Sequence, residues 1–176
     1  MNERLWHVSD REDISVFFPR PVPPGAVGIS SAAVWAIGES RLANYLLPRE
    51  CPRVCFWHSP STTEEDARQF LGQARHAVVL EGAWYQQLAS ASVWLYEMPH
   101  EHFTCIDESA RYFTSSTPVT PRIQVHIADL RSEIVNHGAE LRSTNRLREL
   151  AAEVASSTLA FSIIRLRNAQ SIADAA

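Results

Sequence analysis

The sequence contains no lysine, so all 16 of its basic residues are arginine. A chain without lysine cannot form a Schiff base through a lysine amine, and it cannot build the phosphate-binding loop that ends in Gly-Lys-Ser or Gly-Lys-Thr. Any anion site must therefore be made of arginine, whose planar guanidinium suits two-point recognition of phosphate or carboxylate.

Signals for membrane insertion, export and nucleic-acid binding are also missing. No apolar run approaches the roughly 20 residues that span a bilayer, and the first residues lack the charged and apolar regions of a secretory signal. The net charge of −4 offers no general attraction to nucleic acid or to anionic lipid. We therefore expect a cytoplasmic protein whose partners include neither nucleic acid nor a membrane.

Only three cysteines are present, Cys51, Cys55 and Cys105, and an odd number cannot be fully paired within the chain. Three residues separate Cys51 from Cys55, whereas zinc knuckles and thioredoxin-like redox centres use a gap of two. The run 54–57, which contains Cys55, is apolar and strand-like. We therefore expect reduced thiols, with Cys55 in the core.

The length of 176 residues and the 45% hydrophobic content suit one domain with a sizeable core. Short runs rich in β-branched and aromatic residues predict strands at 4–9, 33–37, 54–57, 77–80, 93–98, 103–106, 111–115 and 122–127. Helical spacing and capping patterns predict helices at 39–47, 63–72, 84–90, 128–137 and 145–167. The predicted fold is α+β: a single domain over 1–176 with a mixed, mainly antiparallel sheet of about seven or eight short strands, short intervening helices, and two C-terminal helices, 128–137 and 145–167, packed on it.

Two segments are expected to lack regular structure. Residues 21–31 contain three prolines and two glycines, which sustain neither a helix nor a strand ladder. The last residues, 171–176, are expected to fray.

The helix predicted over 145–167 carries Leu147, Leu150, Val154 and Phe161 at helical spacing. These side chains could pack inside the domain or against a partner. They support one functional alternative, a non-catalytic interaction module that oligomerises through the C-terminal helix.

The first strand presents a mixed polar and apolar face. Leu5, His7 and Ser9 share this face because side chains alternate along a strand, and such a face suits the floor of a ligand pocket. Arg20 could hold a phosphate, and Tyr45 could stack on a planar ring. In the structural alternative, His7 completes a strand hydrogen bond and Arg20 pairs with a surface carboxylate such as that of Glu12.

A second polar group is the pair of histidines His100 and His102. On an extended chain both imidazoles would point the same way, as in metal-binding pairs, and a third ligand could come from Cys105, Asp107 or His126. No spacing rule selects one of the three, so we assign no metal site. The alternatives are an exposed polar bend and a metal enzyme that uses these two histidines.

Several segments together resemble a family of uncharacterised bacterial proteins, a domain of unknown function. The segments that carry the resemblance are 4–9, 17–20, 34–37, 45–53 and 140–165. They span most of the chain, and the resemblance implies no particular activity.

The chain also resembles, more distantly, the ADP-ribosyltransferase-like fold. In that fold a first strand carries a histidine that binds NAD, a short helix carries a tyrosine that stacks on nicotinamide, and a late strand supplies a glutamate that steadies the ribosyl cation. The order of His7, the strand 34–37 and Tyr45 is similar, and 112–121 resembles the late strand and its turn. The expected glutamate is replaced here by serine and threonine, and the carboxylates that could stand in for it are those of Glu97, Glu101 and Glu108.

This resemblance implies a domain that binds NAD or another nucleotide, with His7 orienting the ligand and the arginines holding phosphate. Turnover, if it occurs, would be transfer to or hydrolysis at a ribosyl carbon. The candidate catalytic residues are His7, Tyr45 and Glu101. The predicted ligand-binding residues are His7, Ser9, Arg20, Tyr45, Arg49 and Arg53.

Overall fold

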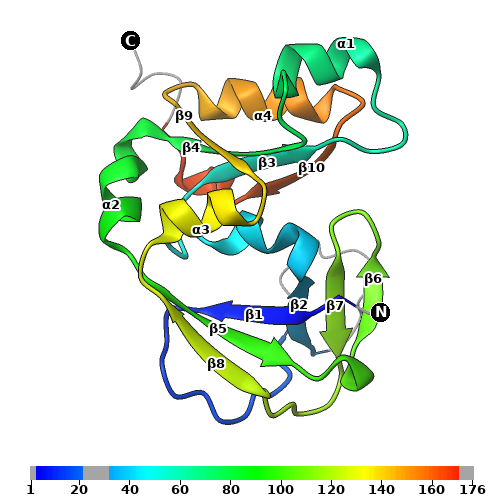
Figure 1. Ribbon diagram of the computed structural model, residues 1–176, viewed down its shortest axis with the longest axis vertical. Coiled ribbons are helices and arrows are strands. Elements are labelled where there is room, and N and C mark those ends of the chain that lie inside the picture. The colour runs from blue at the N-terminus through cyan, green and yellow to red at the C-terminus, as the bar shows by residue number, and fades with distance from the viewer. Residues whose placement is uncertain (1–2, 22–31, 171–176) are drawn as a thin grey trace. The chain divides into compact units, whose positions relative to one another are not determined.

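The computed structural model describes residues 3–21 and 32–170 (Figure 1). The greater part of the predicted loop, 22–31, and the end expected to fray, 171–176, lie outside the described residues. The chain forms two compact units, each made of two stretches that are separated in the sequence. Unit 1 consists of Met1–Leu42 and Val93–Ile127, and unit 2 consists of Ala43–Ser92 and Ala128–Ala176.

The sheet of unit 1 has six strands in the order β6-β7-β2-β1-β5-β8, and every neighbouring pair is antiparallel. Its strands are β1 (Leu5–Ser9), β2 (Val34–Gly38), β5 (Val93–Met98), β6 (Thr104–Asp107), β7 (Tyr112–Ser115) and β8 (Ile123–Ile127). A short 3-10 turn, η4 (His100–His102), joins β5 to β6.

One face of this sheet carries an apolar core because side chains alternate along each strand. The core residues are Leu5, Val34, Ala36, Tyr96, Met98, Phe103 and Phe113, together with Phe17 and Val119 from two loops. The backbones of Phe17 and Val119 pair through hydrogen bonds of 2.8 and 2.9 Å, so the two loops reach the core together.

The sheet of unit 2 has four strands in the order β10-β3-β4-β9; β4 and β9 are parallel and the other pairs are antiparallel. Its strands are β3 (Arg53–Trp57), β4 (His76–Glu81), β9 (Glu140–Thr144) and β10 (Ala160–Ile164). The helices and turns are η1 (Glu39–Tyr45, which begins in unit 1), α1 (Glu64–Asp66), η2 (Ala67–Leu71), η3 (Gly82–Trp84), α2 (Tyr85–Ser90), α3 (Leu130–Asn136), α4 (Leu147–Ala155) and η5 (Leu166–Asn168).

Helix α4 packs on β3 and β4 and completes the core of unit 2 (Figure 1). Its residues Leu147 and Val154 are fully buried in one cluster with Val54, Phe56 and Val79 of the sheet. The apolar side chains of this helix could pack inside the protein or against a partner, and Leu147 and Val154 pack inside the protein.

The α+β class and the mainly antiparallel pairing are confirmed, and all eight predicted strands are present near their expected bounds. The strands form two sheets of six and four strands, where one sheet was expected. The single domain over 1–176 stays a prediction. Among the described residues, no helix is both long and apolar enough to cross a membrane.

The predicted helix over 145–167 is wrong. Helix α4 ends at Ala155, and residues 160–164 form strand β10, which pairs with β3. The Ser157 hydroxyl donates to the Val154 carbonyl oxygen at 2.7 Å, and the Thr158 N–H donates to the Asp66 carboxylate, also at 2.7 Å. These bonds turn the chain out of the helix, and the β-branched and aromatic residues that follow suit a strand.

Strand β9 is not predicted by the sequence. Four of its five residues, Glu-Leu-Arg-Ser-Thr, are polar, and the segment lacks the β-branched and aromatic run that marks the other strands. It forms because β4 offers a backbone edge to which residues 140–144 pair in parallel.

Candidate functional site

The first strand places His7 where the ladder between β1 and β2 ends. That ladder contains only the pairs Leu5–Gly38 and Trp6–Ile37. Beyond it, His7 Nδ1 lies 2.8 Å from the Trp35 carbonyl oxygen. A carbonyl oxygen can only accept, so Nδ1 carries the hydrogen. The contact matches the structural alternative for His7 and fixes the orientation of the ring.

Ser9 stabilises the turn that follows β1. Its hydroxyl oxygen accepts a hydrogen bond from the Arg11 N–H at 3.0 Å. The Tyr96 hydroxyl supports the same turn, since it donates to the Arg11 carbonyl oxygen at 2.8 Å and accepts from the Ile14 N–H at 3.2 Å. The sequence reasoning missed Tyr96, because its position in an apolar strand gave no sign of this contact across 85 residues.

Arg20 is exposed, and its backbone pairs with Ala33 through hydrogen bonds of 3.1 and 2.9 Å. Among the described residues, no ion pair joins its side chain to Glu12. Arg20 therefore lies in an isolated β-bridge with Ala33, and its role in phosphate binding stays a prediction.

All three carboxylates that could stand in for a catalytic glutamate are paired with arginine. Glu97 contacts Arg4 at 2.6 Å, and Glu108 contacts Arg111. The third carboxylate, that of Glu101, accepts two hydrogen bonds from Arg122 at 2.8 and 2.9 Å. A hydrogen bond from its own backbone N–H, followed by the contact with Arg122, lowers the pKa of Glu101 and keeps it ionised.

The histidine pair at positions 100 and 102 does not lie on an extended chain. Residues His100–His102 form one 3-10 turn, so the assumption that both imidazoles point the same way is wrong. Within residues 3–21 and 32–170, no group of three or more His, Cys, Asp and Glu side chains could hold a metal ion. The predicted bend after β5 is confirmed.

Unit 2 contains a buried arginine at the start of β3. Arg53 is 3% exposed. Its Nε donates to the Asn44 carbonyl oxygen at 3.1 Å, its Nη1 donates to the Cys51 carbonyl oxygen at 2.9 Å, and its guanidinium carbon lies 5.6 Å from the centre of the Tyr45 ring. Among the described residues, no ion pair joins a carboxylate to Arg53, and its two hydrogen bonds use Nε and Nη1. Nη2 makes no hydrogen bond within the described part of the chain, but it is not one of the fully buried side-chain atoms that lack a partner.

This arrangement is unusual because buried guanidinium groups are normally paired with a carboxylate or another anion. The two carbonyl oxygens carry only partial charges, and two of five N–H donors are used. The nearest buried carboxylate in the ladder is that of Glu81, one residue beyond Leu80, which pairs with Arg53; it is 2% exposed and makes no ion pair with Arg53 among the described residues. An anionic ligand would supply acceptors for the donors that Arg53 leaves unused.

Two further buried polar residues are linked to Arg53: Asn44 contacts it directly, and His76 contacts Asn44. The Asn44 Oδ1 lies 2.7 Å from His76 Nε2, and the exposed fractions of both side chains are below a tenth. We call Asn44, Arg53 and His76 the Arg53 cluster. The sequence reasoning missed Asn44 and His76. The available signals were an asparagine directly before Tyr45 and a histidine directly before the apolar run 77–80.

The predicted site residues fall into two groups. His7, Ser9, Arg20 and Glu101 belong to unit 1, whereas Tyr45, Arg49 and Arg53 belong to unit 2. Within unit 2, Tyr45 and Arg53 are in contact with each other. Arg49 is exposed in the turn that precedes β3.

The thiols beside the cluster are not nucleophiles. Cys51 and Cys55 are fully buried, and burial raises the pKa of each to about 12. Both remain protonated near neutral pH, which confirms Cys55 as a core residue.

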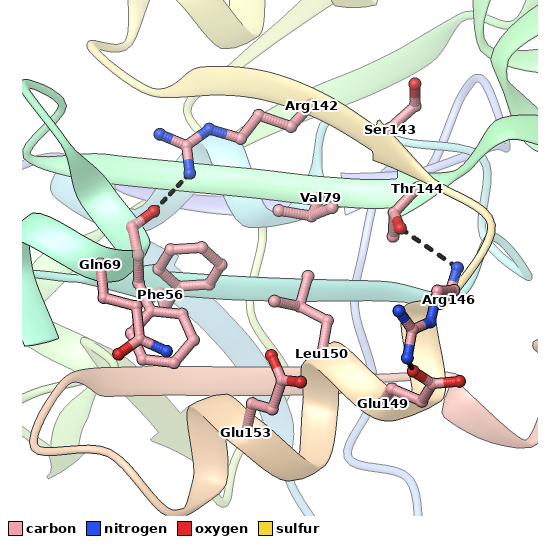
Figure 2. A pocket seen from close by; sticks show the side chains of 11 residues that line it. Phe56, Gln69, Val79, Arg142, Ser143, Thr144, Arg146, Glu149, Leu150 and Glu153 are labelled. Carbon is pink, nitrogen blue, oxygen red and sulfur yellow. Dashed lines mark hydrogen bonds and ion pairs between the residues drawn. The ribbon is translucent and has the colours of Figure 1, made fainter.

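A groove of about 370 Å³ also lies in unit 2, over the buried side chains of Phe56 and Val79 (Figure 2). Two arginines line it, but both are engaged. Arg142 donates to the carbonyl oxygens of Phe70 and, at 2.9 Å, of Leu71. The second, Arg146, pairs with Glu149. The groove therefore offers an apolar floor without an available cation.

Residues 6–169 match a family of unknown function, DUF6886. No curated protein and no solved structure matches the chain.

Proposed function

The chain belongs to DUF6886, a family of unknown function, and we propose that it binds a small phosphorylated ligand of the nucleotide class, with Arg53 holding a phosphate. The observation that carries the proposal is the burial of Arg53 without a carboxylate partner among the described residues. A charge in this position is costly unless an anion compensates for it.

The contacts of Arg53 orient it for such a ligand. The two carbonyl oxygens take one hydrogen each from Nε and Nη1, which leaves both hydrogens of Nη2 and one of Nη1 for two phosphate oxygens. The ring of Tyr45 lies beside the same guanidinium and offers an aromatic face for a base or a nicotinamide. NAD, ADP-ribose and ADP combine both chemical features.

The proposal is for binding without turnover. An oxocarbenium-like transition state needs stabilisation by a negative charge, but Glu97, Glu101 and Glu108 are each neutralised by an arginine. The ligand-binding roles of His7, Ser9 and Arg20 stay separate predictions, and the proposal does not depend on them.

Thermal unfolding in the presence of pyrophosphate, ADP, ADP-ribose and NAD tests the proposal. A ligand at a hundredfold excess over its dissociation constant should stabilise the native state by about 2.7 kcal/mol. Adenosine, which has no phosphate, should cause a much smaller shift. The proposal is wrong if none of the four phosphorylated compounds raises the melting temperature.

Variants assign the effect to the site. Arg53→Lys keeps the charge but loses the planar fork, so the affinity for pyrophosphate should fall by about tenfold. Tyr45→Leu should weaken binding of ADP and leave pyrophosphate binding unchanged. The control is Arg68→Gln, which removes an exposed charge from η2. Equal losses in Arg53→Lys and Arg68→Gln would show that general charge, and not Arg53, attracts the ligand.

A further inference from the structure

Strand β8 leaves one edge of the unit 1 sheet unpaired. It pairs with β5 along one side, and none of the described residues pairs with its other side (Figure 1). Four of its five residues are exposed, including Ile123 at 49% and Val125 at 36%. An exposed edge of this kind presents free N–H and C=O groups to any strand that can pair with it.

The edge also lacks the usual protection against pairing. The sequence Ile-Gln-Val-His-Ile contains no proline and no acidic or arginine residue, and its ladder with β5 is continuous. The other edges differ. A register shift near Asp107 interrupts β6, Glu140 and Arg142 charge β9, and only Phe161 is exposed in β10. Bulges and charges block edge-to-edge association at β6 and β9. Strand β10 carries neither, but four of its five residues are partly buried, so β8 is the most exposed of the four edges.

The sequence of β8 is complementary to itself. If two copies pair antiparallel about a two-fold axis at Val125, Ile123 lies opposite Ile127, Gln124 lies opposite His126, and Val125 meets its own copy. Apolar side chains then meet on one face and hydrogen-bonding side chains on the other. A register shifted by one residue would instead place Ile123 opposite His126 and Gln124 opposite Val125.

We propose that β8 is a homodimer interface, in which two copies of the chain join their six-stranded sheets edge to edge in this register. The pairing is isologous, because each residue meets the same partner in both directions. The mode is addition of a strand to an open sheet edge. Five paired residues make a small interface, and small interfaces are typical of weak, reversible association.

Sedimentation velocity over a series of concentrations tests the dimer. The wild-type chain should shift from monomer to dimer as its concentration rises through the dissociation constant. Val125→Glu places two carboxylates opposite each other on the two-fold axis and should raise that constant by at least about tenfold. Val135→Glu is the matched control, because Val135 is 60% exposed but lies on α3. A wild-type chain that stays monomeric at millimolar concentration overturns the proposal, and so does a Val125→Glu chain that dimerises like wild type.

Mixing two charge variants separates the interface from any effect on folding. Replacing Gln124 and His126 by two lysines sets like charges opposite each other in the proposed dimer, and replacing both by two glutamates does the same. Each variant alone should be monomeric, whereas an equal mixture should form heterodimers through opposite charges. A mixture that stays monomeric contradicts the proposed register.

Cross-linking tests the register directly, in a Cys105→Ser background. Opposed residues in an antiparallel pair have Cα atoms about 4.5 to 5.5 Å apart, which a disulfide can bridge. Val125→Cys should therefore form a disulfide-linked dimer on oxidation. Gln124→Cys should not, because its counterpart lies diagonally across the pair. Efficient cross-linking at 124 and none at 125 would refute the register.

Discussion

At the scale of single residues, burial has opposite consequences for the two kinds of polar group at the start of β3. The thiols of Cys51 and Cys55 respond to burial by staying neutral, since each pKa is raised to about 12. A guanidinium cannot respond in this way, because arginine stays protonated in proteins. Arg53 therefore keeps its charge inside the protein, and this difference makes it a candidate binding residue while the cysteines are packing residues.

The thiols provide a prediction at this scale. In the native protein at pH 8, a disulfide reagent should modify Cys105 slowly, because this thiol is partly exposed but desolvation and the neighbouring Glu108 raise its pKa. The reagent should leave Cys51 and Cys55 unmodified. A thiol with a pKa near 12 is ionised in only about one molecule in ten thousand at that pH, and the thiolate is the reactive form. Counting thiols before and after addition of guanidinium chloride measures this. Rapid modification of all three in the native protein would contradict it.

At the scale of elements, Arg142 and Arg146 show how position decides the contribution of an arginine. Both line the groove of unit 2 (Figure 2). Arg142 reaches from β9 to the last carbonyl groups of η2, which lack partners within their own helix. Arg146 stands at the exposed start of α4 and pairs with Glu149, one turn along the helix.

We therefore expect unequal losses of stability from matched substitutions. Arg142→Gln should lower the free energy of unfolding by about 1 to 2 kcal/mol, because charge-assisted hydrogen bonds to partly buried carbonyl groups are lost. Arg146→Gln should lower it by no more than about 0.5 kcal/mol, as is usual for an exposed ion pair. Urea unfolding followed by circular dichroism compares the two. Equal losses would mean that the contacts of Arg142 with η2 contribute little.

At the scale of the whole molecule, the course of the chain is the notable feature. Each unit combines an early and a late stretch of the sequence, so the chain passes between the units three times. The first half, up to Ser92, contributes β1 and β2 to a sheet of six strands and β3 and β4 to a sheet of four. Neither half of the sequence contains a complete sheet.

This interleaving predicts that fragments 1–92 and 93–176 do not fold alone. Each lacks the strands that cover and extend its own, so too little apolar surface would be buried. Amide proton spectra of the separate fragments should show poor dispersion. A native-like spectrum for either fragment would contradict the prediction, and recovery of dispersion on mixing the two would show that both remain competent. A single cooperative transition of the intact chain would support the prediction of one domain over 1–176.

Local sequence patterns were sufficient to predict most of the helices and strands, but they were insufficient to predict a few of them. The strand that became β5 is recognisable from its β-branched and aromatic residues, and η1 from the spacing of Leu42 and Leu46. Strand β9 is mostly polar, and β10 continues the helical spacing of the segment before it. Both form through pairing with β4 and β3, and a partner strand that is distant in the sequence leaves no local signal.

The sequence alone determined the α+β class, the positions of the apolar strands, the reliance on arginine for any anion site and the inclusion of Arg53 among the candidates. These properties depend on composition and on short-range periodicity. Only the tertiary structure decided that Arg53 is buried without a carboxylate, that Glu97, Glu101 and Glu108 are neutralised, and that β8 has an open edge. Burial, ion pairing and strand neighbours are properties of residues brought together from distant parts of the chain, so they exist only once the chain has folded.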